Sequence, residues 1–326
     1  MVDKHSGSPS VSIIVPFKKA TPYLHDCISG LLSQKIQNFE LICIPDLQEN
    51  IDVNDERVIV IAKSGTPSEK RNYAVSIARS EIIAFIDDDA IPSENWLETG
   101  LQDMEKEGVV GGPNVAPKNE GARRIASDLF LTSVFGSLRE VYRYKSVANK
   151  MYVDNLLTVN MLIRKDIFIG IGGFNLNFWP GEDTHFSEEL KKTGRRIYYD
   201  PNLIVYHHRR EVFRDHLTQI WRYAKYRGAA IKIGEFKPFY LISSIFLIFV
   251  PVIIYLSIVF SPIIALFAFG LILFISIGIF ANFYKRCSNL LASMLGTLTV
   301  WASHVTYGAG VLYGIFFTHL KTESQR

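Results

Sequence analysis

The sequence from residue 238 to residue 320 carries only two charged side chains, Lys285 and Arg286, and most of its other residues are apolar. A helix needs about 20 consecutive apolar residues to cross a bilayer. Three runs have at least this length: 239–260, 263–283 and 290–317. We therefore expect a transmembrane region of about three helices over residues 238–320, preceded by a domain outside the membrane over residues 11–237.

Charge and cysteine content limit the partners and the location. The net charge of +3 and the pI near 8.6 are too mild to indicate a nucleic-acid partner. Three widely spaced cysteines without metal-site spacing fit reduced thiols in or facing the cytoplasm. The Lys285 and Arg286 loop favours the cytoplasmic side for itself and for residues 11–237 in a multi-pass protein of the cell membrane. Residues 1–10 are polar, lack the apolar stretch of a secretory signal, and are expected to be disordered.

The first domain alternates short apolar runs with helical patterns. The expected strands are 11–16, 39–44, 58–61 and 82–86. A helix is expected from Pro22 to Leu32 with Thr21 as its N-cap, and another from Pro67 to about Arg79 with Thr66 as its N-cap. This alternation predicts an α/β fold with a mostly parallel, Rossmann-like sheet whose ligand lies off the carboxyl ends of the strands.

The strand at 82–86 runs directly into three acids, Asp87, Asp88 and Asp89. Adjacent carboxylates repel one another, and a hard divalent cation that takes carboxylate oxygens would hold them together. Asp46 follows the strand at 39–44 and should reach the same crevice. The alternative is an ordinary solvated acidic turn, because Asp is common in turns.

Four segments in order, 11–34, 39–46, Lys70-Arg71-Asn72 and 85–89, resemble the nucleotide-binding half of the family-two inverting glycosyltransferases, which have the GT-A fold. The resemblance implies that residues 11–115 form this half, that Asp46 contacts the nucleobase, and that Asp87 and Asp89 are the outer acids of the DxD element. Pro45 departs from the family, which has two adjacent acids here. Expected nucleotide-sugar contacts in this half are Pro16, Asp46, Lys70, Arg71, Asn72, Asp87 and Asp88. Lys70 and Arg71 are alternatively ordinary solvated helix residues.

The resemblance continues over an acceptor half, residues 116–237. Gly181-Glu182-Asp183 occupies the place of the family's catalytic base, and displacement with inversion needs a carboxylate that takes the acceptor proton. Asp183 is the expected base and Glu182 the second choice. Both acids are alternatively part of an ordinary helix start, where the helix dipole favours negative charge.

Further expected contacts follow toward the membrane. His207 ends an apolar strand where related enzymes place a third metal ligand, after Asp87 and Asp89. Residues 219–223 are similar to the family's QxxRW element with Tyr in the last place, which argues against a processive enzyme. Expected diphosphate or acceptor contacts are Arg209, Arg210, Gln219 and Arg222. Residues 122–148 are expected to form an amphipathic helix, either at the membrane surface or packed on the domain.

Together these features predict a membrane-anchored inverting glycosyltransferase. It would use Mg²⁺ or Mn²⁺ and a uridine or guanosine diphosphate sugar, and transfer the sugar to a lipid-linked acceptor in surface polysaccharide or glycan biosynthesis. Two alternatives stay open at this point: a processive polysaccharide synthase, and a membrane scaffold that keeps the fold without catalysis.

Overall fold

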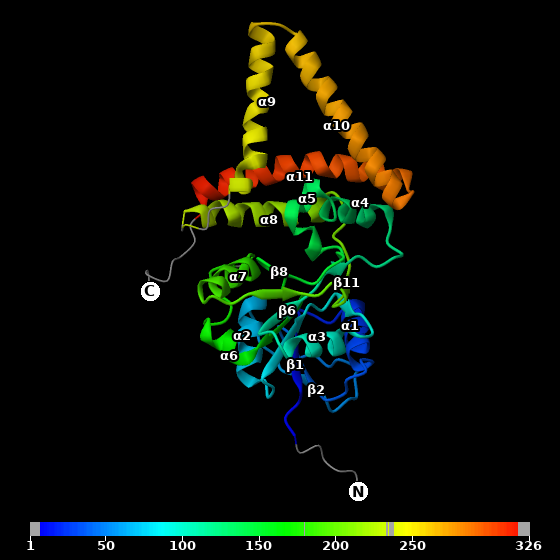
Figure 1. The fold of residues 1–326 in the computed structure, drawn as a ribbon, viewed down its shortest axis with the longest axis vertical. Helices are drawn as coiled ribbons and strands as arrows, with labels where there is room; N and C mark the ends of the chain where they lie inside the picture. The colour runs from blue at the N-terminus through cyan, green and yellow to red at the C-terminus, as the bar shows by residue number, and fades with distance from the viewer. Residues whose placement is uncertain (1–6, 179, 233, 235–237, 319–326) are drawn as a thin grey trace. The chain divides into compact units, whose positions relative to one another are not determined.

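The computed structural model describes residues 7–178, 180–232, 234 and 238–318 (Figure 1). These residues form two compact units. The first unit contains the described parts of Met1–Pro117 and Tyr142–His208, and the second contains Lys118–Val141 and the described parts of Arg209–Arg326. The division differs from the expected boundary at residue 237, because residues 118–141 and the described part of 209–237, both assigned to the first domain, group with the C-terminal helices.

The first unit is built on a mixed eight-stranded sheet with the order β3-β2-β1-β4-β9-β6-β10-β8. Six of its strands run in one direction, since only β9 and β8 pair antiparallel with their neighbours. The expected mostly parallel α/β sheet is therefore confirmed. The strands are β1 (Val11–Pro16), β2 (Phe39–Ile44), β3 (Val58–Val60), β4 (Ile82–Ile86), β6 (Val109–Gly111), β8 (Met151–Val153), β9 (Asn160–Arg164) and β10 (Ile197–Tyr199).

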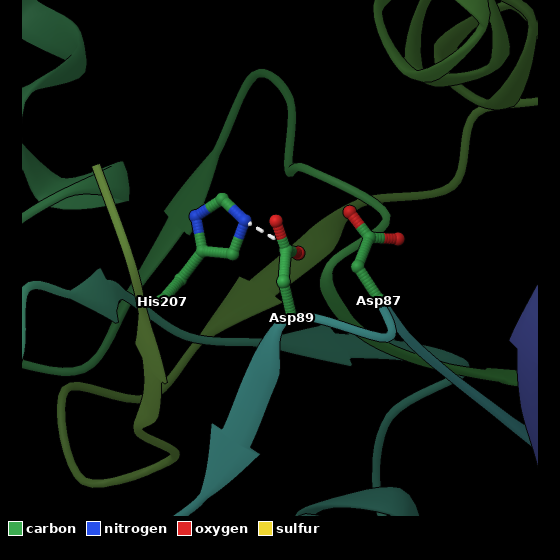
Figure 2. A group of neighbouring side chains, drawn as sticks. All are labelled: Asp87, Asp89 and His207. Atoms are coloured by element: carbon green, nitrogen blue, oxygen red, sulfur yellow. Dashed lines mark hydrogen bonds and ion pairs between the residues drawn. The ribbon is translucent and has the colours of Figure 1, made fainter. Parts of the chain in front are cut away.

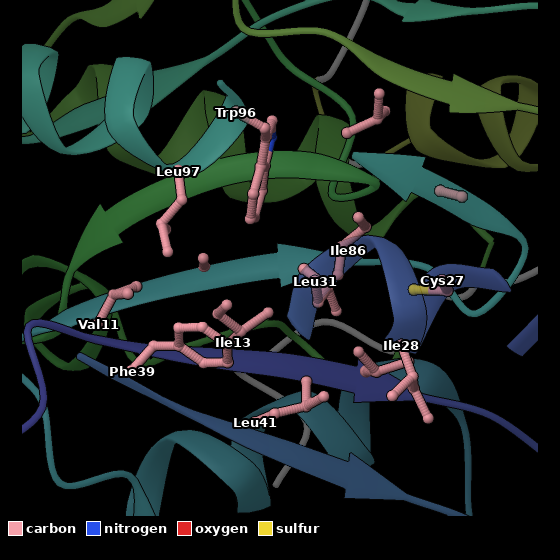
Figure 3. Packing of buried hydrophobic residues seen from close by; sticks show 14 of the residues in the cluster. Val11, Ile13, Cys27, Ile28, Leu31, Phe39, Leu41, Ile86, Trp96 and Leu97 are labelled. Atoms are coloured by element: carbon pink, nitrogen blue, oxygen red, sulfur yellow. The ribbon is translucent and has the colours of Figure 1, made fainter. Parts of the chain in front are cut away.

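Helices cover both faces of this sheet because its central strands are apolar on both sides. Successive residues of a strand point to opposite faces, so Ile13 packs with α1 and α3, whereas Ile14 packs with α2, α6 and α7. Figure 3 shows Ile13 in the first cluster, with Leu31 of α1 and Trp96 of α3. The helices are α1 (Pro22–Leu32), α2 (Pro67–Ile77), α3 (Trp96–Met104), α6 (Lys165–Gly170) and α7 (Glu182–Lys192).

The two predicted helix starts are confirmed in atomic detail. The Thr21 side chain accepts a hydrogen bond from the backbone N–H of Leu24, and Pro22 is in the first turn of α1. At α2, Thr66 and Glu69 form a reciprocal capping box. These caps fix where α2 begins, and so fix which residues of α2 face the ends of the strands.

A small second sheet, not expected from the sequence, lies beyond β4. It has the order β5-β11-β7, with β5 at Ala90–Pro92, β11 at Val205–His207 and β7 at Asn114–Val115. β11 pairs antiparallel with β5, which places His207 opposite Ala90. The last residue of β11 is thereby brought beside the acidic triplet that precedes β5.

The second unit is helical. The segment expected as one helix over 122–148 is broken into α4 (Ala122–Leu131), the short α5 (Val134–Ser137) and the 3₁₀ helix η1 (Leu138–Arg143). The remaining elements are α8 (Arg214–Ile231), η2 (Pro238–Leu241), α9 (Ile242–Val259), α10 (Ile263–Cys287) and α11 (Leu290–Phe317). Within this unit α11 runs along α8, whereas α9 and α10 extend away from them (Figure 1).

Two helices in the described part of the chain are long and apolar enough to cross a membrane, Pro238–Val259 and Ile263–Cys287. Both are largely exposed along their length, since only 11% and 6% of their most apolar windows are buried. The third segment expected to span, 290–317, forms α11, which is not apolar enough to count as a candidate span. Instead its small residues pack on α8, where Gly228 approaches the carbonyl of Val311 so closely that a side chain at this glycine would collide.

Candidate functional site

The acidic triplet and the second sheet together form a group of three metal-ligand side chains in the first unit. One ligand atom from each of Asp87, Asp89 and His207 lies within 4.8 Å of the others, and all three side chains are half-buried. Figure 2 shows Asp89 beside both His207 and Asp87, and Nε2 of His207 is 3.0 Å from Oδ1 of Asp89. Asp87 follows β4, Asp89 precedes β5 and His207 ends β11, so the group depends on three strand ends.

This arrangement fits a divalent cation. Mg²⁺ binds oxygen ligands at about 2.1 Å, so two ligands on opposite sides of one ion lie roughly 4 Å apart. The three candidate ligand atoms lie within 4.8 Å of one another, so they are near enough to share one ion. Carboxylate and imidazole are both ligands of divalent first-row metals, and half-buried side chains leave coordination positions for water or a bound phosphate.

Arg71 of α2 connects the metal group to α7. Its Nη2 atom lies 2.6 Å from Oδ1 of Asp87, and its Nη1 atom lies 3.3 Å from Oε1 of Glu182. Its side chain is only 4% exposed. Burial raises the pKa of Glu182, and the neighbouring Asp183 charge raises it further, whereas Arg71 opposes both effects.

Asp46 is paired with Lys70, one residue before Arg71 on α2. The Lys70 Nζ atom lies 2.6 Å from Oδ1 of Asp46 and also donates a hydrogen bond to the carbonyl of Phe17. The hydrogen bond from Lys70 holds the pKa of Asp46 below its ordinary value. The Lys70 side chain is 2% exposed and that of Asp46 is 30% exposed, so Asp46 is the member of the pair that a ligand can reach.

Asn72 contacts the protein backbone. Its Nδ2 donates to the carbonyl of Phe174 at 2.8 Å, and its Oδ1 accepts from the backbone N–H of Phe174 at 2.9 Å. In the structure this side chain therefore holds the turn after Gly173. Pro16 is buried at the end of β1, and Asp88 is half-buried between the two candidate metal acids.

Asp183 is in the first turn of α7, next to Glu182. The N-cap position belongs to Gly181, and its backbone, with φ of 126°, provides no side-chain cap. The half-buried Asp183 carboxylate accepts a hydrogen bond from the backbone N–H of Thr184 at 2.7 Å. Asp183 is thus on the accessible side of the helix start, whereas Glu182 is turned inward toward Arg71.

The other expected contacts lie in the second unit. There the Nε atom of Arg209 lies 2.8 Å from Oδ1 of Asp128, and the arginine is buried. Gln219 is 3.5 Å from the hydroxyl of Tyr223, and both Arg210 and Arg222 are exposed. Within the first unit the structure brings Asp87, Asp89, His207, Arg71 and Glu182 together. The division of the chain assigns Arg209, Arg210, Gln219 and Arg222 to the second unit.

Sequence reasoning missed Asn160, which begins β9 and is buried. Its Oδ1 accepts from Nε1 of Trp96 at 2.8 Å. Its Nδ2 donates to the carbonyls of Pro113 and Leu203, at 3.2 and 2.6 Å. Since these carbonyls precede β7 and β11, Asn160 helps to position the strand that ends in His207. A single amide within an otherwise apolar run, Val159-Asn160-Met161, was the available signal.

Comparison with known proteins finds glycosyltransferases. The chain is 29% identical over 109 residues to the glycosyltransferase GlyG of Streptococcus pneumoniae, a match that covers 30% of this chain and 36% of that protein. It is 23% identical over 260 residues to the dolichyl N-acetyl-alpha-D-glucosaminyl phosphate 3-beta-D-2,3-diacetamido-2,3-dideoxy-beta-D-glucuronosyltransferase of Methanococcus voltae, covering 71% of this chain and 77% of that one. The chain thus spans about a third of the length of some relatives and most of the length of others.

Among solved structures, the mannosyltransferase PcManGT from Pyrobaculum calidifontis, in complex with GDP-Man and Mn²⁺, matches with a TM-score of 0.57. The match covers 90% of this chain and 87% of that chain at 14% sequence identity, so it establishes a common fold. The expected GT-A-like fold is confirmed by this likeness. The profile of the family "Glycosyl transferase family 2" matches residues 12–169, which include most of β1, all of β4 and the acidic triplet. Residues 12–169 of the chain therefore resemble a glycosyl transferase family 2 domain.

Proposed function

We propose that the protein is a metal-dependent inverting glycosyltransferase that moves a sugar from a nucleotide-sugar to a lipid-linked acceptor. The observation that carries this proposal is the group formed by Asp87, Asp89 and His207 in a chain whose residues 12–169 resemble a glycosyl transferase family 2 domain. A metal-ligand group at the carboxyl end of β4 is where an open α/β sheet binds its ligand.

Asp87, Asp89 and His207 would hold Mg²⁺ or Mn²⁺. When bound, this cation supplies positive charge that stabilises the negative charge developing on the leaving diphosphate. The solved structure of PcManGT contains GDP-Man and Mn²⁺, which supports a nucleotide-sugar donor and a divalent cation here. Asp46, charged and partly exposed, would contact the base of a uridine or guanosine diphosphate sugar.

Asp183 is the proposed general base. Displacement with inversion requires one carboxylate to take the proton of the acceptor hydroxyl as the oxygen attacks the anomeric carbon. Asp183 is half-buried at the start of α7, and so it is open to an acceptor. Glu182 is buried and paired with Arg71, an arrangement that suits it less well for exchanging a proton with a substrate.

A lipid-linked acceptor fits the rest of the chain. The relative from Methanococcus voltae carries a dolichyl phosphate in its name. Two exposed apolar helices, α9 and α10, would keep the protein in the membrane where such acceptors are. Lys285 and Arg286 at the end of α10 favour the cytoplasmic side for that end of the helix.

The decisive test is binding followed by transfer. Isothermal titration of the full chain in detergent with uridine and guanosine diphosphate sugars, with and without Mn²⁺, should show binding that needs the metal. Incubation with a radiolabelled donor and a lipid extract should then move label into the lipid fraction. Absence of metal-dependent donor binding across both nucleotides would overturn the proposal and favour a membrane scaffold.

A further inference from the structure

One turn of α2 contacts three different parts of the first unit. Successive residues of a helix are 100° apart around its axis, so Lys70, Arg71 and Asn72 leave α2 in three directions. Lys70 pairs with Asp46 after β2, Arg71 pairs with Asp87 and Glu182, and Asn72 holds the backbone of Phe174. α2 is therefore a common support for the nucleotide side and the α7 side of the site.

Of these contacts, the one between Arg71 and Glu182 joins the residues that are farthest apart in the sequence. A guanidinium is a planar fork that can hold one carboxylate on each branch, whereas a lysine ammonium is a point charge on a flexible stem. Here one branch meets Asp87 and the other meets Glu182, which is 111 residues away in sequence. Because the Arg71 side chain is 4% exposed, water and salt screen these contacts little.

Glu182 determines how α7 begins. It is the first residue of α7, and its Oε2 accepts a hydrogen bond from the backbone N–H of Gly181 at 3.0 Å while Oε1 faces Arg71. Gly181 provides no side-chain cap. The contact between Arg71 and Glu182 therefore fixes the start of α7 relative to Asp87, and Asp183 is the next residue along.

Asn72 reinforces this attachment through the aromatic core. The turn that it holds carries Phe174, whose ring packs against Phe186 of α7 with centroids 5.0 Å apart. The Arg71 guanidinium lies over the same Phe174 ring, 5.9 Å from its centroid. Consecutive residues of α2 thus reach α7 by an ion pair and by a hydrogen-bonded turn.

We propose that Arg71 is a positioning residue, which holds α7 and its Asp183 in register with the carboxylates Asp87 and Asp89. In this assignment Glu182 is the counter-charge that Arg71 holds, and it does not take the acceptor proton. The inference rests on the proposed function in one respect, that Asp183 is the base. The attachment of α7 through Arg71 can be tested without any activity.

The kinetic test compares Glu182→Gln, Arg71→Lys and the double variant in the full chain. Each single change should lower kcat about 10- to 100-fold, the scale of a 1 Å misplacement of a reacting group, and change the donor KM less than about threefold. The double variant should be no slower than the slower single variant, because each single change already breaks the ion pair between Arg71 and Glu182. Glu189→Gln removes the same charge from a half-buried residue of α7 that pairs with Lys192 and not with Arg71; it is the matched control and should behave as wild type.

The second readout is amide hydrogen exchange in α7 of the metal-free protein. The backbone N–H of His185 donates to the carbonyl of Gly181 at 3.0 Å and reports the first turn of the helix. Exchange in α7 should accelerate in Glu182→Gln and in Arg71→Lys, but not in Glu189→Gln, while β1 and β2 stay protected.

Three results would overturn the inference: unchanged exchange in α7, full kcat in Arg71→Lys, or a loss of kcat in Glu182→Gln that exceeds about 100-fold and equals that in Asp183→Asn. The last result would make Glu182 the base. A wild-type protein without transfer activity would instead contradict the proposed function, and the exchange experiment would still decide whether Arg71 holds α7.

Discussion

The Nε2 atom of His207 lies 3.0 Å from Oδ1 of Asp89, although 118 residues separate them in the sequence. Strand pairing explains the contact. β11 is antiparallel to β5, and the register that pairs Val205 with Pro92 also places His207 opposite Ala90, the residue after Asp89. A one-residue slip would turn His207 to the other face of the sheet. The candidate metal group therefore depends on the register of two three-residue strands.

Replacing Asp89 with asparagine tests the metal group. The variant loses a charge that a cation would need and that also faces His207. We expect binding of the nucleotide-sugar in the presence of Mn²⁺ to weaken by about 100-fold or more, since even outer-shell changes cost 10- to 100-fold in metal affinity. Titration calorimetry measures this directly. As a control, Glu94→Gln removes one negative charge from an exposed residue that follows β5, and this variant should bind the donor as wild type does. Unchanged binding in Asp89→Asn would remove Asp89 from the site.

Replacing Asp183 with asparagine separates binding from transfer. The amide cannot accept the acceptor proton, and a positioned general base contributes about 10²- to 10⁴-fold to rate. We expect kcat to fall by this factor while the donor Kd stays within about threefold of wild type. Steady-state transfer assays measure kcat, and calorimetry measures the donor Kd. Unaffected turnover would return Asp183 to the role of an ordinary helix-start acid.

Much of the first unit could be predicted because its signals are local. β1, β2 and β4 are continuous apolar runs, and α1 and α2 begin with Thr caps followed by Pro, which constrain the backbone within a few residues. The pairing of β5 with β11 could not be predicted. β5 has only three residues and ends in Pro92, so its place in a sheet depends on a partner more than 100 residues away.

The second unit was harder because composition does not distinguish helix packing from membrane contact. α11 contains no Asp, Glu, Lys or Arg, a composition that would also suit a membrane span, but Gly308 and Gly314 approach the backbones of other helices in this unit too closely for a side chain. The helix expected over 122–148 is interrupted where Gly136 lies against the carbonyl of Phe130 and where Leu138 adopts a φ of 49°. Both interruptions depend on contacts that sequence periodicity does not report.

The turn held by Asn72 gives a prediction about stability. Gly173 has a φ of 72°, and a Cβ there would lie 2.8 Å from Oδ1 of Asn72. Gly172 also has a left-handed backbone, with a φ of 90°, but a Cβ there meets nothing within 4 Å. We expect Gly172→Ala to cost about 1 kcal/mol of unfolding free energy through backbone strain alone, and Gly173→Ala to cost about 1 to 2 kcal/mol more. Denaturant unfolding measures the difference; equal losses would mean that Asn72 adapts freely.

The membrane assignment of α10 is tested by charge at mid-helix. Phe274 is 75% exposed near the centre of the helix, so its surroundings would be lipid. Phe274→Arg should make insertion less favourable by about 2.5 to 3.5 kcal/mol, the cost of an arginine at the centre of a span. Glycosylation mapping of inserted chains reports this shift. Tyr284→Arg, beside Lys285 at the helix end, should insert as wild type, and equal insertion of both variants would contradict lipid contact at Phe274.

His216 predicts how the stability of the second unit depends on pH. This fully buried side chain links three helices: its Nδ1 is 2.8 Å from the hydroxyl of Ser127 on α4, and its Nε2 is 3.0 Å from that of Ser303 on α11. Burial lowers the pKa of His216 from 6.5 to about 4. The unfolded chain therefore takes up this proton as the pH falls below 6.5, whereas the folded protein does so only near pH 4.

The sign of this linkage follows from the neutral folded form. The contribution of His216 to stability is fully present above pH 6.5 and is lost as the pH falls from 6.5 toward 4, by up to about 1.4 kcal/mol per pH unit. In His216→Gln, which keeps a polar side chain that does not titrate, the free energy of unfolding in detergent should fall less steeply over that range. His25→Gln, at an exposed histidine on α1, controls for the loss of a histidine. Parallel curves for wild type and His216→Gln would show that His216 takes up its proton over the same pH range in the folded protein as in the unfolded chain, and that its two serine contacts do not require the neutral ring.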